Sequence, residues 1–115
     1  MYIRLMYSKD LIKGTLKPII LKLLQEQGRM YGYEITQKVK DITNGKIEIT
    51  EGALYPTLHK LEAEGIVTTE KEYIGKRVRK YYTLTTSGNS TVTQKVGELT
   101  DFLSTMHMIF NPKTS

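Results

Sequence analysis

The sequence predicts a mostly helical fold that contains one small β-hairpin and ends in a long helix. Three observations support this fold class. Apolar residues recur at helical spacing in three segments before residue 66. Two short β-prone stretches then lie on either side of Gly75, and after Thr85 the apolar residues recur with spacings of four and three. At 115 residues, the chain has the length of one domain with an appended element.

The composition is that of a globular protein, and it excludes several functional classes. Lys and Arg number 17 against 12 Asp and Glu, for a net charge of +5. Because cysteine is absent, the chain has no disulfide, thiolate nucleophile or cysteine-based metal site. The longest apolar run, residues 18–21, is far shorter than the ~20 residues of a membrane span, and no signal-peptide core is present. We therefore expect a cytoplasmic protein with no membrane partner.

The first strongly apolar face predicts a helix from residue 15 to about residue 27. Pro18 lacks the N–H that a helix interior requires, so we place it in the first turn, and Gly28 supplies the stop. Residues 8–13 are expected to form a separate turn or a kinked segment before it. The residues that share the apolar face are Leu16, Ile19, Ile20, Leu23 and Leu24.

Two shorter helices are predicted next, separated by a turn at Asn44-Gly45. The first of them starts after Gly32. The second spans residues 51–64, because Thr50 is a suitable N-cap and Gly65 a suitable stop. Their inward-facing residues are Ile35, Val39 and Ile42 in the former and Leu54, Leu58 and Leu61 in the latter.

The pattern then changes to two β-prone stretches, residues 66–74 and 78–85, joined by Gly75-Lys76-Arg77. Residues 66–85 hold five basic and two acidic side chains, so most of the net charge falls in this hairpin. Basic charge concentrated beside tyrosines is typical of a surface that binds nucleic acid. A solvated hairpin with another role carries such a cluster as well, so the charge alone does not decide between them.

A terminal helix is expected over about residues 87–110, which at ~1.5 Å per residue is about 36 Å long. A small domain cannot cover its whole apolar stripe, so we expect the helix to pair with its copy in a homodimer. The alternative is that the stripe packs on the first helix of its own chain. The stripe, with the spacing of a coiled-coil seam, comprises Val92, Val96, Leu99, Leu103, Met106 and Phe110.

Three helices followed by a hairpin is the element order of a winged helix-turn-helix. In that fold the third helix enters the DNA major groove and the hairpin, or wing, contacts the backbone or the minor groove. We assign residues 1–86 to such a DNA-binding domain and residues 87–115 to a dimerisation helix and tail. Because element order alone does not establish function, the individual motifs carry further weight.

Five segments carry a family resemblance: residues 13–16, 31–35, 51–58, 61–66 and 79–85. In their order and spacing they resemble the PadR family of bacterial transcriptional regulators. The resemblance extends over roughly residues 11–88, and the single terminal helix resembles the short form of the family. It implies a homodimeric winged-helix protein, in most cases a repressor that a small molecule releases from DNA.

The side of the third helix that faces away from its leucines is the candidate DNA-reading surface. Gly52 and Ala53 let the backbone approach a base or a phosphate, and the free amides of the first turn suit an anion. Glu51 favours the helix dipole, repels phosphate, and would accept a hydrogen bond from a cytosine amine. Pro56 is otherwise explained as a kink and Lys60 as a solvated charge. The candidate contacts are Glu51, Gly52, Ala53, Tyr55, Pro56, Thr57 and Lys60, with the roles of Tyr55 and Pro56 implied by the family resemblance.

Other candidate contacts lie outside this helix. Residues Tyr81 and Tyr82 should face opposite sides of the hairpin, so one of them belongs to the core. At the start of the second helix we expect Tyr33, rather than Tyr31, to reach a phosphate. The wing residues expected to contact phosphates or the minor groove are Lys76, Arg77, Arg79 and Lys80.

The sequence carries no motif for catalysis or for a cofactor. It has no Gly-x-Ser-x-Gly, phosphate loop or His-Glu-x-x-His. His59 and His107 stand apart from other ligand types, so we expect neither an enzyme nor a metal site.

We expect instead a repressor dimer that occupies a pseudo-palindromic operator on double-stranded DNA until a small aromatic or phenolic effector binds. The alternative is a winged-helix interaction module that grips an acidic protein and reads no specific DNA sequence. The soft apolar residues offered to an effector between the paired helices are Phe102, Met106, Met108 and Phe110.

Overall fold

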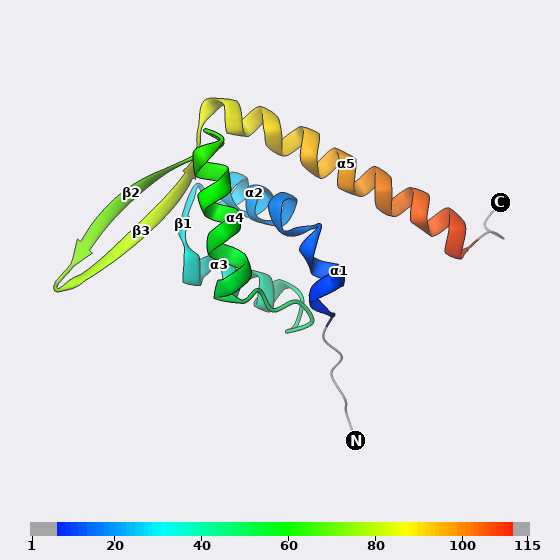
Figure 1. Ribbon diagram of the computed structural model, residues 1–115, viewed down its shortest axis with the longest axis horizontal. Helices are drawn as coiled ribbons and strands as arrows, with labels where there is room; N and C mark the ends of the chain where they lie inside the picture. Colours follow the sequence, from blue (N-terminus) through cyan, green and yellow to red (C-terminus); the bar gives the residue numbers. More distant parts are fainter. Residues whose placement is uncertain (1–6, 112–115) are drawn as a thin grey trace, which may run out of the picture.

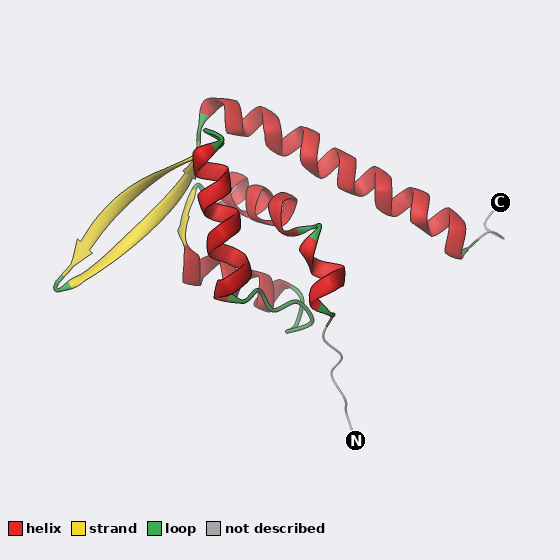
Figure 2. Cartoon of the chain, viewed as in Figure 1, coloured by secondary structure: helices red, strands yellow, loops and turns green. Residues whose placement is uncertain are grey.

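The elements follow one another in the predicted order of helices, hairpin and terminal helix. Figures 1 and 2 show the hairpin and the terminal helix extending in different directions from the shorter helices. The fold is mostly helical with a small antiparallel sheet, as expected for a winged helix-turn-helix. In the computed structural model, which describes residues 7–111, the elements are α1 (Lys9–Lys13), α2 (Leu16–Gln27), β1 (Arg29–Tyr31), α3 (Gly32–Ile42), α4 (Glu51–Ala63), β2 (Val67–Ile74), β3 (Arg77–Leu84) and α5 (Thr86–Phe110).

The helices begin and end at the predicted local signals. Pro18 lies in the first turn of α2, after the N-cap Thr15, and Gly28 ends the helix with a φ of 90°. The Ser8 side chain caps α1, which is a short helix distinct from α2. The Thr50 hydroxyl accepts the Ala53 amide in the first turn of α4 at 3.3 Å, as expected for its N-cap.

The sheet has three strands, whereas the sequence predicted a two-stranded hairpin. The strand order is β1-β3-β2, and both pairings are antiparallel. In β1, Met30 pairs with Tyr82 and Tyr31 pairs with Tyr81. The predicted hairpin is confirmed as β2 and β3, whereas β1 was not predicted. A three-residue strand carries almost no periodicity of its own, and its stability comes from the remote partner β3.

The wing, formed by β2, β3 and their turn, closes through two residues, Gly75 and Lys76. Ile74 and Arg77 pair directly, so Arg77 belongs to β3 rather than to the turn as expected. Gly75 has a φ of 61° and is the residue of this turn with a positive φ, the pattern of a type II′ hairpin turn. The turn therefore holds Lys76 at the outermost point of the wing.

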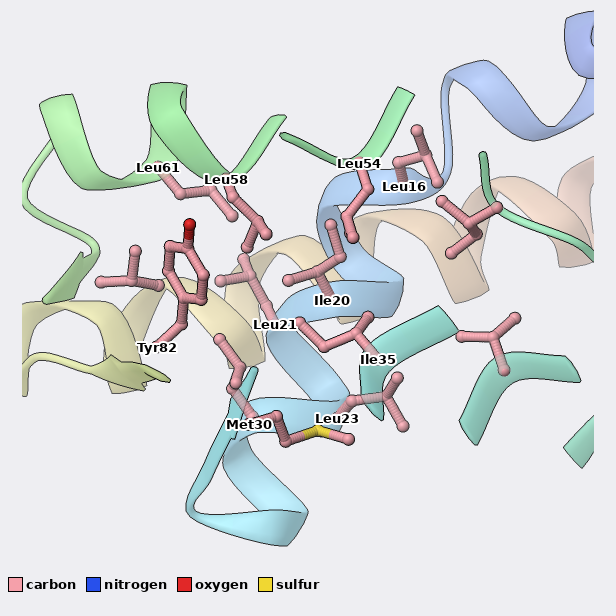
Figure 3. Close-up of a cluster of buried hydrophobic side chains, with 14 of the residues drawn as sticks. Leu16, Ile20, Leu21, Leu23, Met30, Ile35, Leu54, Leu58, Leu61 and Tyr82 are labelled. Atoms are coloured by element: carbon pink, nitrogen blue, oxygen red, sulfur yellow. The ribbon is translucent and has the colours of Figure 1, made fainter. Parts of the chain in front are cut away.

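The core lies where α2, α4 and the sheet meet. Figure 3 shows the leucines of α4 pointing toward α2, with Tyr82 of β3 beside them. Tyr82 is 1% exposed and Tyr81 is half-buried, so Tyr82 is the core member of that pair. The buried residues are Leu16, Ile20, Leu21, Leu23, Leu24, Met30, Ile35, Val39, Ile49, Leu54, Leu58, Leu61, Val67, Tyr82 and Val92.

Burial of Tyr82 makes the stability of the domain sensitive to alkaline pH. Desolvation raises the pKa of Tyr82, and Tyr55 and Glu62 act in the same direction. The unfolded chain ionises this tyrosine near pH ~10, so its contribution is fully present below that pH and is lost as pH rises through the folded pKa. Between pH 8 and pH 11, the free energy of unfolding measured with urea should fall less for the Tyr82→Phe variant than for the natural chain. An equal loss in both proteins would contradict this.

The base of α5 is fixed to the junction between α4 and β2. The Thr85 hydroxyl accepts the Gly88 amide at 3.0 Å and donates to the Gly65 carbonyl at 2.7 Å. The Thr85 amide donates to the Ile66 carbonyl at 3.0 Å. Gly88 lies so close to that carbonyl that a Cβ would overlap its oxygen. The cap and the glycine together set the direction in which α5 leaves the domain.

The apolar stripe of α5 divides into a covered part and an exposed part. Val92 is 1% exposed and belongs to the core, and Val96 packs against that core. The expectation that Val92 lies in a dimer interface is therefore corrected, because Val92 is buried in the core of its own chain. Leu103 is 54% and Phe110 71% exposed. The tail expected after α5 falls in residues 112–115, which lie outside the described part of the chain.

Candidate nucleic-acid interface

The solvent side of α4 presents the residues that the sequence proposed as DNA contacts. Because its leucines are buried against α2, the opposite side of the helix is open. Ala53 and Thr57 are half-buried on one flank. The outer face of α4, as the term is used below, comprises the exposed residues Glu51, Gly52, Tyr55, Pro56, His59 and Lys60.

The backbone of α4 lacks one helix hydrogen bond at Pro56, because proline has no N–H to donate to the Gly52 carbonyl. The Thr57 hydroxyl donates to the Ala53 carbonyl at 3.0 Å, so its proton is used within the helix. Within the described residues 7–111, no atom apart from the chain neighbours and the nearby helix backbone lies within 4 Å of the position that a Cβ on Gly52 would take. The first turn of α4 is therefore a smooth surface with its backbone accessible.

A groove separates the outer face of α4 from the wing. On one side of it, the Tyr55 ring lies against Gly32 at the start of α3, where a Cβ would come within 2.8 Å of Tyr55 Cζ. A side chain on Gly32 would therefore displace the Tyr55 ring from this position. The predicted phosphate contact Tyr33 is 63% exposed at this groove. We call it the wing-side groove; its main lining residues are Tyr31, Tyr33, Tyr55, His59, Arg79 and Lys80.

Arginines and tyrosines alternate across β1 and β3. The Tyr31 and Tyr81 rings meet edge to face with centroids 5.4 Å apart. The Arg29 guanidinium lies 4.0 Å from the centroid of Tyr81, and that of Arg79 lies 4.5 Å from the centroid of Tyr31. A hydrogen bond to Tyr81 raises the pKa of Arg79. Arg79 is therefore held at the edge of the wing-side groove.

Arg29 is a residue that the sequence reasoning missed. Its guanidinium pairs with Glu72 at 2.6 Å and with Glu70 at 3.5 Å. The hydrogen bond to Glu72 raises the pKa of Arg29. These two carboxylates are the acidic residues of the wing, so Arg29 offsets the negative charge that would repel DNA. The sequence signal that could have placed Arg29 on a strand is the alternation of polar and apolar residues over residues 29–31, which is too short to interpret.

Lys80 forms an ion pair, whereas the basic residues at the wing tip form none with the described residues. The Lys80 ammonium pairs with Glu62 of α4 at 3.6 Å, and Glu62 also accepts the Thr69 hydroxyl at 3.0 Å. This contact ties the wing to α4. Lys76 and Arg77, by contrast, form no ion pair within residues 7–111. The two predicted contacts at the wing tip therefore carry uncompensated charge, as does Lys71 on β2.

Other kinds of site find little support in the described part of the chain. Within residues 7–111, no cluster of His, Asp or Glu has the composition of a metal site. In the same range, no helix combines the length and hydropathy that crossing a bilayer requires.

In sequence and in structure the chain is similar to known transcriptional regulators. The model of the transcriptional regulator PadR-like family matches residues 20–94. Uncharacterized protein X of Lysinibacillus sphaericus is 36% identical over 97 residues, which cover 81% of this chain and 85% of that protein. A transcriptional regulator from Clostridium thermocellum has a similar structure, with a TM-score of 0.76, 30% identity, and coverage of 95% of this chain and 99% of that one.

One solved relative contains DNA. The structure of Bacillus subtilis PadR in complex with operator DNA matches with a TM-score of 0.64 and 34% identity. The match covers 71% of this chain and 46% of the Bacillus protein.

Proposed function

The chain belongs to the PadR-like family of transcriptional regulators, and from this premise we propose that the outer face of α4 reads an operator while the wing holds the flanking backbone. The observation that carries the proposal is the outer face of α4, which is exposed, small near its N-terminus, and flanked by basic side chains. The operator complex of the Bacillus subtilis relative supports DNA as the ligand.

We further propose that the protein acts as a homodimer. The radius of gyration is 16.1 Å, against about 13 Å for a compact domain of this length, because α5 and the wing project from the core. The far half of α5 exposes Leu103, Ile109 and Phe110, and pairing with a second copy would bury them. A two-fold dimer would present two α4 helices to a pseudo-palindromic operator.

Repression and its release by an effector form the finer part of the proposal. A bound dimer would block a promoter, and an aromatic or phenolic compound seated between paired α5 helices would change the spacing of the two α4 helices. Exposed Phe102, Met108 and Phe110, with the partly buried Met106, offer soft apolar contacts there. Calorimetry with a panel of such compounds tests this, and the absence of heat from the whole panel would argue against the effector.

The wing tip gives a prediction about salt dependence. Replacing Lys76 and Arg77 together by glutamine should weaken binding to operator and scrambled DNA alike, because phosphate contacts carry no sequence information. The slope of log K against log salt should fall by about 1.8 per bound subunit, at ~0.9 for each lost contact. Fluorescence anisotropy at several salt concentrations measures it. A slope equal to that of a Lys22→Gln/Lys95→Gln control, with the same change of charge, would contradict the wing assignment.

A substitution at Gly52 distinguishes an effect on DNA binding from an effect on folding. Gly52→Ala places a methyl group in open space, and alanine favours helix by ~1 kcal/mol over glycine, so stability should be unchanged or raised. If the α4 backbone approaches DNA at this point, the same methyl group should reduce operator affinity by roughly tenfold. Anisotropy and urea unfolding measure the two effects. Unchanged operator affinity would place the contact elsewhere on α4.

The function as a whole is tested by selection from a genomic DNA pool. Purified protein is incubated with sheared genomic fragments, and those retained are sequenced. We expect repeated enrichment of fragments that share a pseudo-palindrome upstream of genes. Retention without any shared sequence would contradict operator reading and would fit the alternative of a winged-helix module that binds an acidic protein.

A further inference from the structure

A second groove flanks α4 on the side away from the wing, where α1 lies. Figure 1 shows α1 and the wing on opposite sides of α4. The groove runs between α1, the loop before α4, and the first turns of α4 itself. We call it the α1-side groove; the lining residues that matter here are Lys9, Ile12, Lys13, Gly52, Pro56 and Thr57.

Helical spacing assigns the α4 side chains to these two flanks. Tyr55 and His59, at i and i+4, line the wing-side groove. Ala53 and Thr57 line the α1-side groove, and Lys60 continues their row at i+7. The outer face of α4 thus has cations along both of its edges: Arg79 and Lys80 on the wing side, and Lys9 and Lys13 on the other side, where Lys60 is the residue of the face itself nearest to them.

The lysines of the α1-side groove have uncompensated charge. Lys9 and Lys13 stand at i and i+4 on one face of α1, and within residues 7–111 neither forms an ion pair. Two carboxylates also line this groove. Glu48 pairs with Lys40 at 3.5 Å, and Asp10 lies on the adjacent position of α1. The balance of charge in the groove, with Glu48 neutralised by its own partner, remains positive.

The short helix that carries these lysines is fixed in place at both ends. At its start, the Tyr7 amide donates to the Lys46 carbonyl at 3.0 Å, and the Ser8 hydroxyl caps the first turn. At its end, the Thr15 hydroxyl donates to the Ile12 carbonyl at 2.8 Å. Ile12 packs against the core. The position of α1 relative to α4 is therefore set by the fold.

A helix inserted into the major groove has a sugar–phosphate backbone on each side. The groove is about 12 Å wide and a helix with its side chains is about as broad, and the two backbones belong to opposite strands. From this geometry we propose that Lys9 and Lys13, with Lys60, contact phosphates on the strand opposite the one that the wing contacts. The inference rests on the proposed function, because it requires α4 to lie in the major groove.

The test is the double variant Lys9→Gln/Lys13→Gln. Both side chains are exposed, so the urea midpoint should not move. For each bound subunit, we expect the salt slope to fall by about 1.8 and the affinity for operator and scrambled duplexes to fall by a common factor of roughly 10 to 60 at 0.1 M salt. The control is Lys22→Gln/Lys95→Gln, which has the same change of charge. A slope equal to that of the control would overturn the proposal.

Replacing single phosphates of the DNA by neutral methylphosphonates shows which phosphates the protein contacts. In the natural protein, methylphosphonate substitution should cost affinity at phosphates on both strands. In the Lys9→Gln/Lys13→Gln variant, that cost should fall on the strand opposite the wing, where Lys60 alone of the three lysines remains, and should be undiminished on the other strand. An undiminished cost on both strands would overturn this inference while leaving operator binding intact. Failure of the natural protein to prefer its operator would instead overturn the proposed function itself.

Discussion

Replacing Leu103 by glutamate is expected to convert the proposed dimer to a monomer and to weaken operator binding at least 100-fold. Leu103 is 54% exposed in the single chain, at the centre of the free half of the α5 stripe. Pairing would bury it, and a buried unpaired carboxylate is strongly unfavourable. Two linked reading heads gain about 10² to 10⁴ in affinity over one. Sedimentation velocity and fluorescence anisotropy measure the two losses.

A control for this variant is available on the same helix turn. Ser104 is exposed and lies off the stripe, so Ser104→Glu adds the same charge without entering the proposed interface. It should remain dimeric and bind operator nearly as the natural protein does. If Leu103→Glu also remained dimeric, the stripe would not be the dimer interface.

Gly88→Ala should destabilise the domain by about 3 kcal/mol, one of the largest effects that a single methyl group can have here. The added Cβ would overlap the Ile66 carbonyl oxygen and would lie 3.1 Å from Ile66 carbon and 3.3 Å from Leu84 Cδ2. The carbonyl cannot retreat without breaking the hydrogen bond from the Thr85 amide that holds the base of α5. At about 4–8 °C per kcal/mol for a domain of this size, Tm should fall by well over 10 °C.

The matched control for Gly88 is Gly97 of the same helix. In the described part of the chain, only the chain neighbours and the nearby helix backbone lie within 4 Å of the position of a Cβ on Gly97. Gly97→Ala should therefore stabilise the chain by about 0.5–1 kcal/mol through helix propensity alone. Thermal unfolding of both variants separates the effects. Equal Tm values would show that the contact with the Ile66 carbonyl does not constrain α5.

The parts of the fold that sequence predicts well are those set by local chemistry. Pro18, Gly28 and Thr50 each fix a helix boundary through their own backbone preference or side chain, and the structure places those boundaries as expected. β1 could not be foreseen in this way, because its three residues become a strand only by pairing with β3. The spacing that links Val92 to Phe110 is uniform along α5, so it gives no sign of which residues α2 covers.

The same distinction between local chemistry and tertiary packing applies to the candidate site. Burial of the leucine stripe fixes the outer face of α4, and the sequence therefore predicts it. The stacking of Arg79 on Tyr31 depends on the register between β1 and β3. The position of Lys9 and Lys13 beside α4 depends on how α1 packs. Charge counting from sequence treats all such cations alike, whereas the structure separates the paired ones from the free ones.

The most direct test of the central proposal, that α4 reads a DNA sequence, is fluorescence anisotropy with two duplexes. One carries the DNA upstream of the gene encoding this chain or the fragment recovered by genomic selection, and the other is its scrambled counterpart. At near-physiological salt, the account predicts affinity for the first that is greater by about 10³ or more. Weak, salt-sensitive and equal binding to both duplexes would contradict it.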